Sequence, residues 1–150
     1  MHYFEDFHTG DSFDLGSLTV TQEEIISFAQ HFDSQYFHTD PERARRSIFG
    51  GLVASGWHTT ALFMRMFVDS LLSHTDSIAS PGINELRWLK PVRPNDTLRG
   101  RFIVTDTRVS QSRPDIGILY SHCELFNQHN ELLMTFNGIH FVGRKPTESL

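Results

Sequence analysis

The chain has 150 residues, of which 39% are hydrophobic and 12% aromatic, and this is enough apolar material for the core of one ordinary domain. Lysine and arginine together number 13 against 18 aspartate and glutamate residues, so the formal net charge is -5 at pH 7. This balance excludes the basic surface that nucleic-acid binding requires.

The single cysteine, Cys123, has no second cysteine with which to form a disulfide, so the sequence requires no oxidising compartment. The first residues mix acidic and aromatic side chains, and they lack the basic start and apolar run of a signal peptide. No apolar run has the length needed to span a bilayer. We therefore expect a cytoplasmic protein with neither nucleic acid nor a membrane as its partner.

Two helix starts occur in the first third of the chain. Thr21-Gln-Glu-Glu24 is a capping box, and it is followed at helical spacing by Ile25, Phe28, Ala29 and Phe32. This pattern predicts a helix of about ten residues that ends near Asp33. A polar connection runs from residue 35 to residue 47, and within it Asp40-Pro41-Glu42 predicts a second, short helix.

A longer helix is expected over residues 55–72, with Ser55 as its N-cap. Its apolar residues form one stripe and then extend around most of the cylinder: Trp57, Ala61, Met64, Val68 and Leu71, together with Leu62, Phe63, Met66 and Phe67. Such a helix is typically buried on nearly all sides. Its polar edge consists of His58, Arg65 and Asp69, of which Arg65 and Asp69 are spaced as a surface ion pair.

Strand patterns fill the second half of the chain, at residues 83–89, 97–109, 116–127 and 132–142, and residues 12–19 could add an edge strand. Turn residues separate the four runs, which favours consecutive antiparallel pairing. The order of elements predicts an α+β fold in which a curved antiparallel sheet wraps around a long central helix.

The candidate chemistry lies between the two main helices. The nine histidines have no metal-ligand spacing, and no nucleotide-binding glycine loop or nucleophile elbow is present. What remains is the carboxylate and imidazole of Asp33-Ser-Gln-Tyr-Phe-His38, a pair that also fits ordinary turn chemistry on a solvated loop. The segment 49–58 follows, in which the backbone N–H of Gly56 would begin the long helix and offer an oxyanion site. Close packing against the sheet is the alternative role of its glycines.

Residues 33–66 resemble the MaoC-like dehydratase and (R)-specific enoyl-CoA hydratase family, whose signature is Asp-x-Asn-Pro-aliphatic-His followed by a glycine-containing helix start. The stretch Trp88-Leu-Lys-Pro-Val-Arg-Pro-Asn-Asp-Thr-Leu98 is similar to the family's Pro-Val-x-Pro-Gly-Asp segment. Gln35 and Tyr36 differ from the family pattern, since they stand where it has Asn and Pro.

This resemblance implies a single hot-dog domain over residues 1–150, a homodimer or higher homo-oligomer, and no metal or cofactor. The implied reaction is reversible hydration of a 2-enoyl thioester carried by CoA or an acyl carrier protein, as in fatty acid metabolism. Asp33 and His38 correspond to the catalytic acid/base pair, and Gly56 to the glycine whose N–H polarises the thioester carbonyl. Around them we expect the substrate to contact Gln35, Tyr36, Phe37, Phe49, Gly51, Ser55 and Trp57.

Two details of the reaction follow from the residues. A carboxyl group that exchanges protons near neutral pH needs a raised pKa, and burial beside Phe32, Tyr36, Phe37 and Phe49 is expected to provide it. His58 is either a helper in catalysis or a polar-edge residue that points toward a neighbouring subunit or water.

Two other functions remain open on the same fold. The first is an acyl-CoA thioesterase, in which water attacks the thioester carbon instead of C3. The second is a non-catalytic module that binds acyl thioesters.

Overall fold

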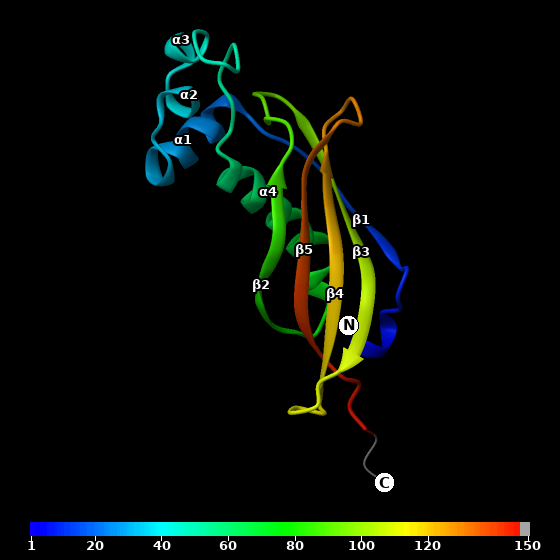
Figure 1. The fold of residues 1–150 in the computed structure, drawn as a ribbon. Coiled ribbons are helices and arrows are strands. Elements are labelled where there is room, and N and C mark those ends of the chain that lie inside the picture. The colour runs from blue at the N-terminus through cyan, green and yellow to red at the C-terminus, as the bar shows by residue number, and fades with distance from the viewer. Residues whose placement is uncertain (148–150) are drawn as a thin grey trace.

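The computed structural model describes residues 1–147, which form one five-stranded antiparallel sheet with a long helix against it (Figure 1). The strands are β1 (Ser12–Thr19), β2 (Ser77–Trp88), β3 (Thr97–Val109), β4 (Ile116–Phe126) and β5 (Leu132–Gly143), in the order β1-β3-β4-β5-β2. The five expected strands are confirmed, and β2 begins six residues before the expected start at residue 83.

The expected helices are confirmed as well. Helix α1 (Gln22–Phe32) begins after Thr21, whose hydroxyl accepts a hydrogen bond from the N–H of Glu24. Helix α3 (Pro41–Ala44) begins after Asp40, whose carboxylate accepts from two backbone N–H groups. A further helical turn, α2 (Tyr36–Thr39), lies in the segment expected to be a polar connection, and two single turns, Phe4–Asp6 and Leu72–His74, complete the helical elements of the described chain.

Consecutive pairing is correct for β3, β4 and β5 but wrong for β2. Strand β2 pairs with β5, with Ile83 opposite Gly138, while β3 takes β1 as its other neighbour. The connection between β2 and β3 explains the difference, because it spans residues 89–96 and contains Pro91 and Pro94. It is longer than an ordinary hairpin loop, and its prolines cannot donate to a sheet ladder. As a result β1 and β2 form the two edges of the sheet.

Helix α4 (Gly56–Ser70) packs one side on the sheet, where Phe67 stacks on Phe102 with ring centroids 4.8 Å apart and Phe63 meets Phe136 at 5.0 Å. The expectation that this helix is buried on nearly all sides is wrong. Trp57, Met64 and Val68 are 59%, 48% and 38% exposed. The reason is geometric, because a single sheet covers only one side of a helix and the other elements do not reach the opposite side.

The apolar core lies between α4 and the sheet. Helices α1, α2 and α3 gather at one end, beside the start of α4 (Figure 1). The expected surface ion pair forms within α4, with Arg65 Nε 2.9 Å from Asp69 Oδ2. Within residues 1–147, no helix has the length and apolar character needed to cross a membrane.

Candidate active site

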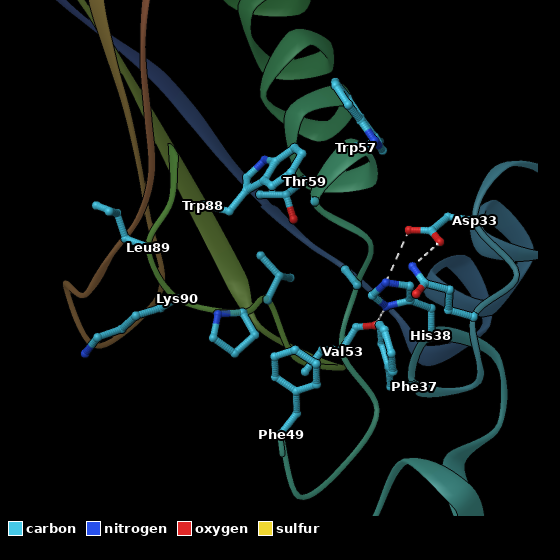
Figure 2. Close-up of a pocket in the computed structure, with 15 residues that line it drawn as sticks. Asp33, Phe37, His38, Phe49, Val53, Trp57, Thr59, Trp88, Leu89 and Lys90 are labelled. Carbon is cyan, nitrogen blue, oxygen red and sulfur yellow. Dashed lines mark hydrogen bonds and ion pairs between the residues drawn. The ribbon is translucent and has the colours of Figure 1, made fainter. Parts of the chain in front are cut away.

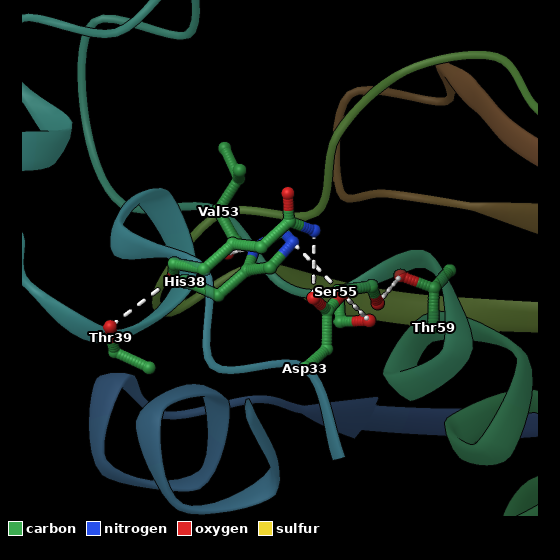
Figure 3. A network of polar contacts seen from close by, with 7 residues as sticks. Asp33, His38, Thr39, Val53, Ser55 and Thr59 are labelled. Atoms are coloured by element: carbon green, nitrogen blue, oxygen red, sulfur yellow. Dashed lines mark hydrogen bonds and ion pairs between the residues drawn. The ribbon is translucent and has the colours of Figure 1, made fainter. Parts of the chain in front are cut away.

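Three segments meet at the end of the molecule where the short helices gather: the end of α1, the turn α2 and the start of α4 (Figures 2 and 3). Asp33 follows directly after α1, His38 lies in α2, and Ser55 and Gly56 begin α4. The expected proximity of the acid and the imidazole is therefore present, with His38 Nε2 3.3 Å from Asp33 Oδ2.

His38 is buried, and its ring is held by the backbone on the side away from Asp33. Its Nδ1 lies 2.6 Å from the carbonyl oxygen of Val53, and since a carbonyl can only accept, Nδ1 carries a hydrogen and donates it (Figure 3). The other ring nitrogen, Nε2, is consequently the one that faces Asp33.

Asp33 accepts two further hydrogen bonds. The Gln35 side-chain amide donates to Oδ1 at 2.7 Å, and the Ser55 hydroxyl donates to Oδ2 at 2.8 Å. Burial by itself raises the pKa of the Asp33 carboxyl, but these two bonds and the nearby His38 ring outweigh it, so the pKa lies below its ordinary value.

The expectation of a raised pKa at Asp33 is therefore wrong. The sequence argument assumed burial among aromatic side chains, whereas Phe32 is 76% exposed and contributes little of it. It also had no means of showing the hydrogen bonds from Gln35 and Ser55. At neutral pH Asp33 is therefore a carboxylate.

Ser55 stands at the N-cap position of α4, where its hydroxyl makes no capping bond and donates to Asp33. The first N–H groups of a helix have no intrahelical partner. Within residues 1–147, no group accepts a hydrogen bond from the N–H of Gly56. The start of α4 thus offers a backbone donor beside the Asp33 and His38 pair, as the sequence predicts.

Gly56 is also required for packing. A Cβ atom at this position would lie 2.4 to 2.7 Å from three ring atoms of Trp88. The Trp88 indole N–H donates to the Thr60 hydroxyl at 3.1 Å, and the ring meets Trp57 edge-on with centroids 5.1 Å apart. Both roles expected for this glycine therefore fit the structure. Its N–H has no acceptor within residues 1–147, and its lack of a side chain lets the indole of Trp88 pack against it.

These groups border a pocket of about 460 Å³ (Figure 2). Seven of the ten expected site residues line it: Asp33, Gln35, Phe37, His38, Phe49, Gly56 and Trp57. Sequence reasoning missed the rest of the lining, which is Val53, Ala54, Thr59, Trp88, Leu89, Lys90, Pro91 and Val92. The family-like segment that begins at Trp88 was the available signal, since it supplies five of these eight residues.

Three expected contact residues lie outside the lining. Ser55 is fully buried and acts on Asp33. Tyr36 turns toward the surface, where the Arg43 guanidinium lies 4.7 Å from its ring centroid. Gly51 belongs to the loop between α3 and α4, near the Arg93 side chain.

His58 is not a polar-edge residue and does not line this pocket. It is 6% exposed and stacks on Phe28 at 4.6 Å, because α1 packs over that side of α4. Burial lowers the pKa of its imidazole, and its Nδ1 has no hydrogen-bond partner among the described residues. Neither role expected for His58 agrees with this environment.

The family described as "MaoC like domain" matches residues 6–122, a stretch that includes Asp33, His38 and Gly56. The chain belongs to the MaoC-like family. A MaoC-like dehydratase structure from Rhodospirillum rubrum superposes with a TM-score of 0.92 at 40% identity, covering 98% of this chain and 100% of that one. The sheet and central helix of this MaoC-like domain form a hot-dog fold.

Two curated relatives extend the comparison. The uncharacterized protein YdeM of Bacillus subtilis is 34% identical over 125 residues, which cover 83% of this chain and 86% of YdeM. The 3-hydroxyacyl-thioester dehydratase Z of Mycobacterium tuberculosis is 36% identical over 84 residues, or 55% of this chain and 56% of that enzyme. The MaoC-like family thus includes hydratases and dehydratases.

Proposed function

We propose that this MaoC-like domain, spanning residues 1–150, catalyses the reversible hydration of a 2-enoyl thioester. One observation carries the proposal: an ionised carboxylate, the imidazole whose Nε2 faces it, and a helix-start N–H with no acceptor within residues 1–147 border the same pocket. The dehydratase activity of a relative supports the same class of reaction.

In the proposed reaction, water adds to C3 of the enoyl group and a proton is added to C2. Formation of the bond between oxygen and C3 shifts the double-bond electrons toward the thioester oxygen, which becomes an enolate. Asp33 and His38 bind the water, take one of its protons, and return one proton to C2, so that one water is added overall. Dehydration follows the same steps in reverse.

Gly56 stabilises the charge that forms during this reaction. Its N–H is the first of α4, where the helix dipole favours negative charge, and it is available to the thioester oxygen. Trp88 holds the start of the helix in place through its contact with Gly56 and its hydrogen bond to Thr60. The donor is therefore oriented before substrate arrives.

The proposal is tested with Asp33→Asn, His38→Ala and the control His31→Ala. His31 lies on α1 outside the pocket, and within residues 1–147 its ring forms a hydrogen bond only with the Ser27 carbonyl four residues earlier. Loss of the conjugated-enoyl absorbance measures hydration of a panel of enoyl-CoA esters. Each active-site variant should lose on the order of 10²-fold or more in kcat, with the control near wild type.

Two outcomes would redirect the proposal. Release of free CoA from saturated acyl-CoA, lost in the same variants, would assign the site to a thioesterase. Tight binding of acyl-CoA with no turnover of any enoyl ester would assign it to a binding module. Folded single variants that retain more than about half the wild-type rate would remove Asp33 and His38 from the mechanism.

A further inference from the structure

His58 is a buried titratable side chain that the proposed reaction does not use. It lies in the first turn of α4, two residues after Gly56, and is 6% exposed. Of the side-chain nitrogens and oxygens buried within residues 1–147, its Nδ1 is the one without a hydrogen-bond partner. A buried nitrogen without a partner costs free energy that a phenyl ring of similar size would avoid. An imidazole at this position therefore points to a role that depends on its nitrogens.

The His58 ring joins the two helices that position the proposed reacting groups. It stacks on Phe28 of α1, with ring centroids 4.6 Å apart and the ring planes 6° from parallel. Three residues earlier, at the start of α4, the Ser55 hydroxyl donates to the Asp33 carboxylate at 2.8 Å. Residues three positions apart lie on the same side of a helix, so both contacts face α1. Together they hold the end of α1 against the start of α4.

Asp33 follows the position of α1, because its backbone N–H still bonds the Ala29 carbonyl at 2.8 Å in the last turn of that helix. A shift of Phe28 away from α4 would therefore move the Asp33 carboxylate relative to His38. Displacement of a reacting group by about 1 Å is enough to lower a rate on the order of 10²-fold. The stack of His58 on Phe28 can thus affect the proposed reaction from outside the pocket.

His58 also borders an open hollow on the surface of α1. The titratable groups that line this hollow with it are all on α1: Glu23, Glu24 and His31. The charge of Glu24 favours the charged imidazole, but burial has the larger effect, so the pKa of His58 lies below its ordinary value of 6.5. On α4 itself, Arg65 and Asp69 pair with each other about two turns further along.

The neutral and charged forms of His58 require different surroundings. A neutral imidazole carries one hydrogen, so its enclosed Nδ1 can remain without one. An imidazolium carries a hydrogen on both nitrogens, and the N–H at Nδ1 would then be enclosed without an acceptor among the described residues. Glu24 offers a counter-charge at the hollow. Protonation therefore favours a ring that leaves Phe28 and turns toward Glu24.

We propose that His58 is a positioning residue for the reaction at Asp33: its neutral ring holds α1 against α4, and on protonation it turns toward Glu24, releases Phe28 and lowers turnover. This inference rests on the proposed function for the reaction that is measured. Because burial lowers the pKa of His58, the change in the folded protein occurs below pH 6.5. The neutral, holding form is therefore complete at about pH 8 and is lost as the pH falls.

The kinetic test compares wild type with His58→Ala and His58→Phe in the enoyl-absorbance assay. At about pH 8, His58→Ala removes the stacked ring and should lose on the order of tenfold in kcat, with KM changed less than about twofold. His58→Phe keeps a ring against Phe28 and should rescue most of this loss. As the pH falls, wild type should lose activity in a step that His58→Phe lacks. Asp33 and His38 are present in both proteins, so the difference between their profiles isolates His58.

Two further variants sharpen the assignment. Glu24→Gln should move the wild-type step to lower pH, because loss of the negative charge disfavours the imidazolium. Glutamine also suits this position, three residues after the Thr21 cap. The matched control is His31→Phe, the same substitution at an exposed histidine of the same hollow, and it should keep the wild-type profile.

NMR gives a readout that needs no turnover. In wild type the His58 ring should titrate below pH 6.5, and the backbone N–H resonance of Asp33 should shift with the same midpoint. In His58→Phe the Asp33 resonance should lack this step.

Matching pH profiles of wild type and His58→Phe, or folded His58→Ala with the full wild-type kcat, would overturn the inference. The NMR result separates this failure from that of the proposed reaction. A hydratase in which the Asp33 resonance does not follow His58 refutes the role of His58 alone. A protein that shows the linked midpoints but hydrates no enoyl ester refutes the proposed reaction alone.

Discussion

Alanine at position 56 would place a methyl group in the space that the Trp88 indole occupies. The nearest ring atom would be 2.4 Å from the new Cβ, and ordinary van der Waals contact begins about 1 Å farther out. The indole must therefore move, and its 3.1 Å hydrogen bond to Thr60 is lost with the movement. The indole contacts Trp57 and Thr60, which both belong to α4. The strain therefore also acts on the start of that helix.

The expected cost follows from these contacts. Overpacking of this kind lowers the free energy of unfolding by about 1 to 3 kcal/mol, which for a chain of this length is a fall of several degrees in Tm. Displacement of the Gly56 N–H by about 1 Å should in addition reduce kcat for hydration by on the order of 10²-fold. Urea unfolding and the enoyl-absorbance assay measure the two effects separately.

Gly51→Ala is the matched control, because its Cβ would meet only the Arg93 side chain at 3.7 Å, an ordinary contact. Its stability should stay within about 0.5 kcal/mol of wild type. The double variant Gly56→Ala with Trp88→Ala removes the clash. The unfolding free energy that it loses should therefore be smaller than the sum of the two single-variant losses by more than about 0.5 kcal/mol. Additive effects in this cycle would refute the packing role assigned to Gly56.

Three other predictions concern the Asp33 loop and the exposed edge. Because the pKa of Asp33 is lowered in the folded protein, the stability that its carboxylate contributes is present above about pH 4 and is lost below it. The difference in unfolding free energy between wild type and Asp33→Asn should therefore be constant from about pH 7 to 5 and shrink toward about pH 3, and shrinkage above pH 5 would contradict the lowered pKa. Gln35→Asn with Tyr36→Pro should retain hydratase activity. Tyr36 is the first residue of α2, where proline is tolerated, and Gln35 already has the extended backbone that a residue before proline favours. A folded, inactive double variant would show that the native loop serves other chemistry. Sedimentation should show a homodimer or larger assembly, because β2 is an open edge beside the exposed apolar side of α4, and a species of only 17.3 kDa at micromolar concentration would refute this.

Local signals were sufficient to predict the elements of this fold. The Thr21 cap, the Asp40-Pro41 start and the turn residues between strands each act within a few residues of the structure they specify. The pairing of β2 with β5 was not predictable in this way, because it joins segments separated by two other strands. The short turn α2 was missed for the opposite reason, since four residues are too few to show a helical period.

In the candidate site, too, local patterns were predictable from the sequence and tertiary contacts were not. Asp33, His38 and Gly56 were found because they lie in one continuous stretch of sequence with a recognisable pattern. The close packing of Trp88 against Gly56 was not predicted, because these residues lie 32 positions apart in the sequence. The burial of His58 was missed as well, since it depends on how α1 crosses α4. Sequence patterns predicted the groups that we propose to react, whereas the groups that orient them come from tertiary contacts.

The pKa of Asp33 shows how those tertiary contacts decide the chemistry. A carboxyl group with the expected raised pKa would hold its proton near neutral pH and would act first as an acid. The hydrogen bonds from Gln35 and Ser55 favour the ionised form instead, so in the hydration direction the proton must first leave water toward the pair. Ser55 stands at the N-cap position of α4 without making a capping bond, and its hydroxyl stabilises the Asp33 carboxylate. Ser55→Ala and Gln35→Ala each remove one of these bonds, so each should raise the pKa of the Asp33 carboxyl toward its ordinary value, and the pH dependence of kcat for hydration measures the change.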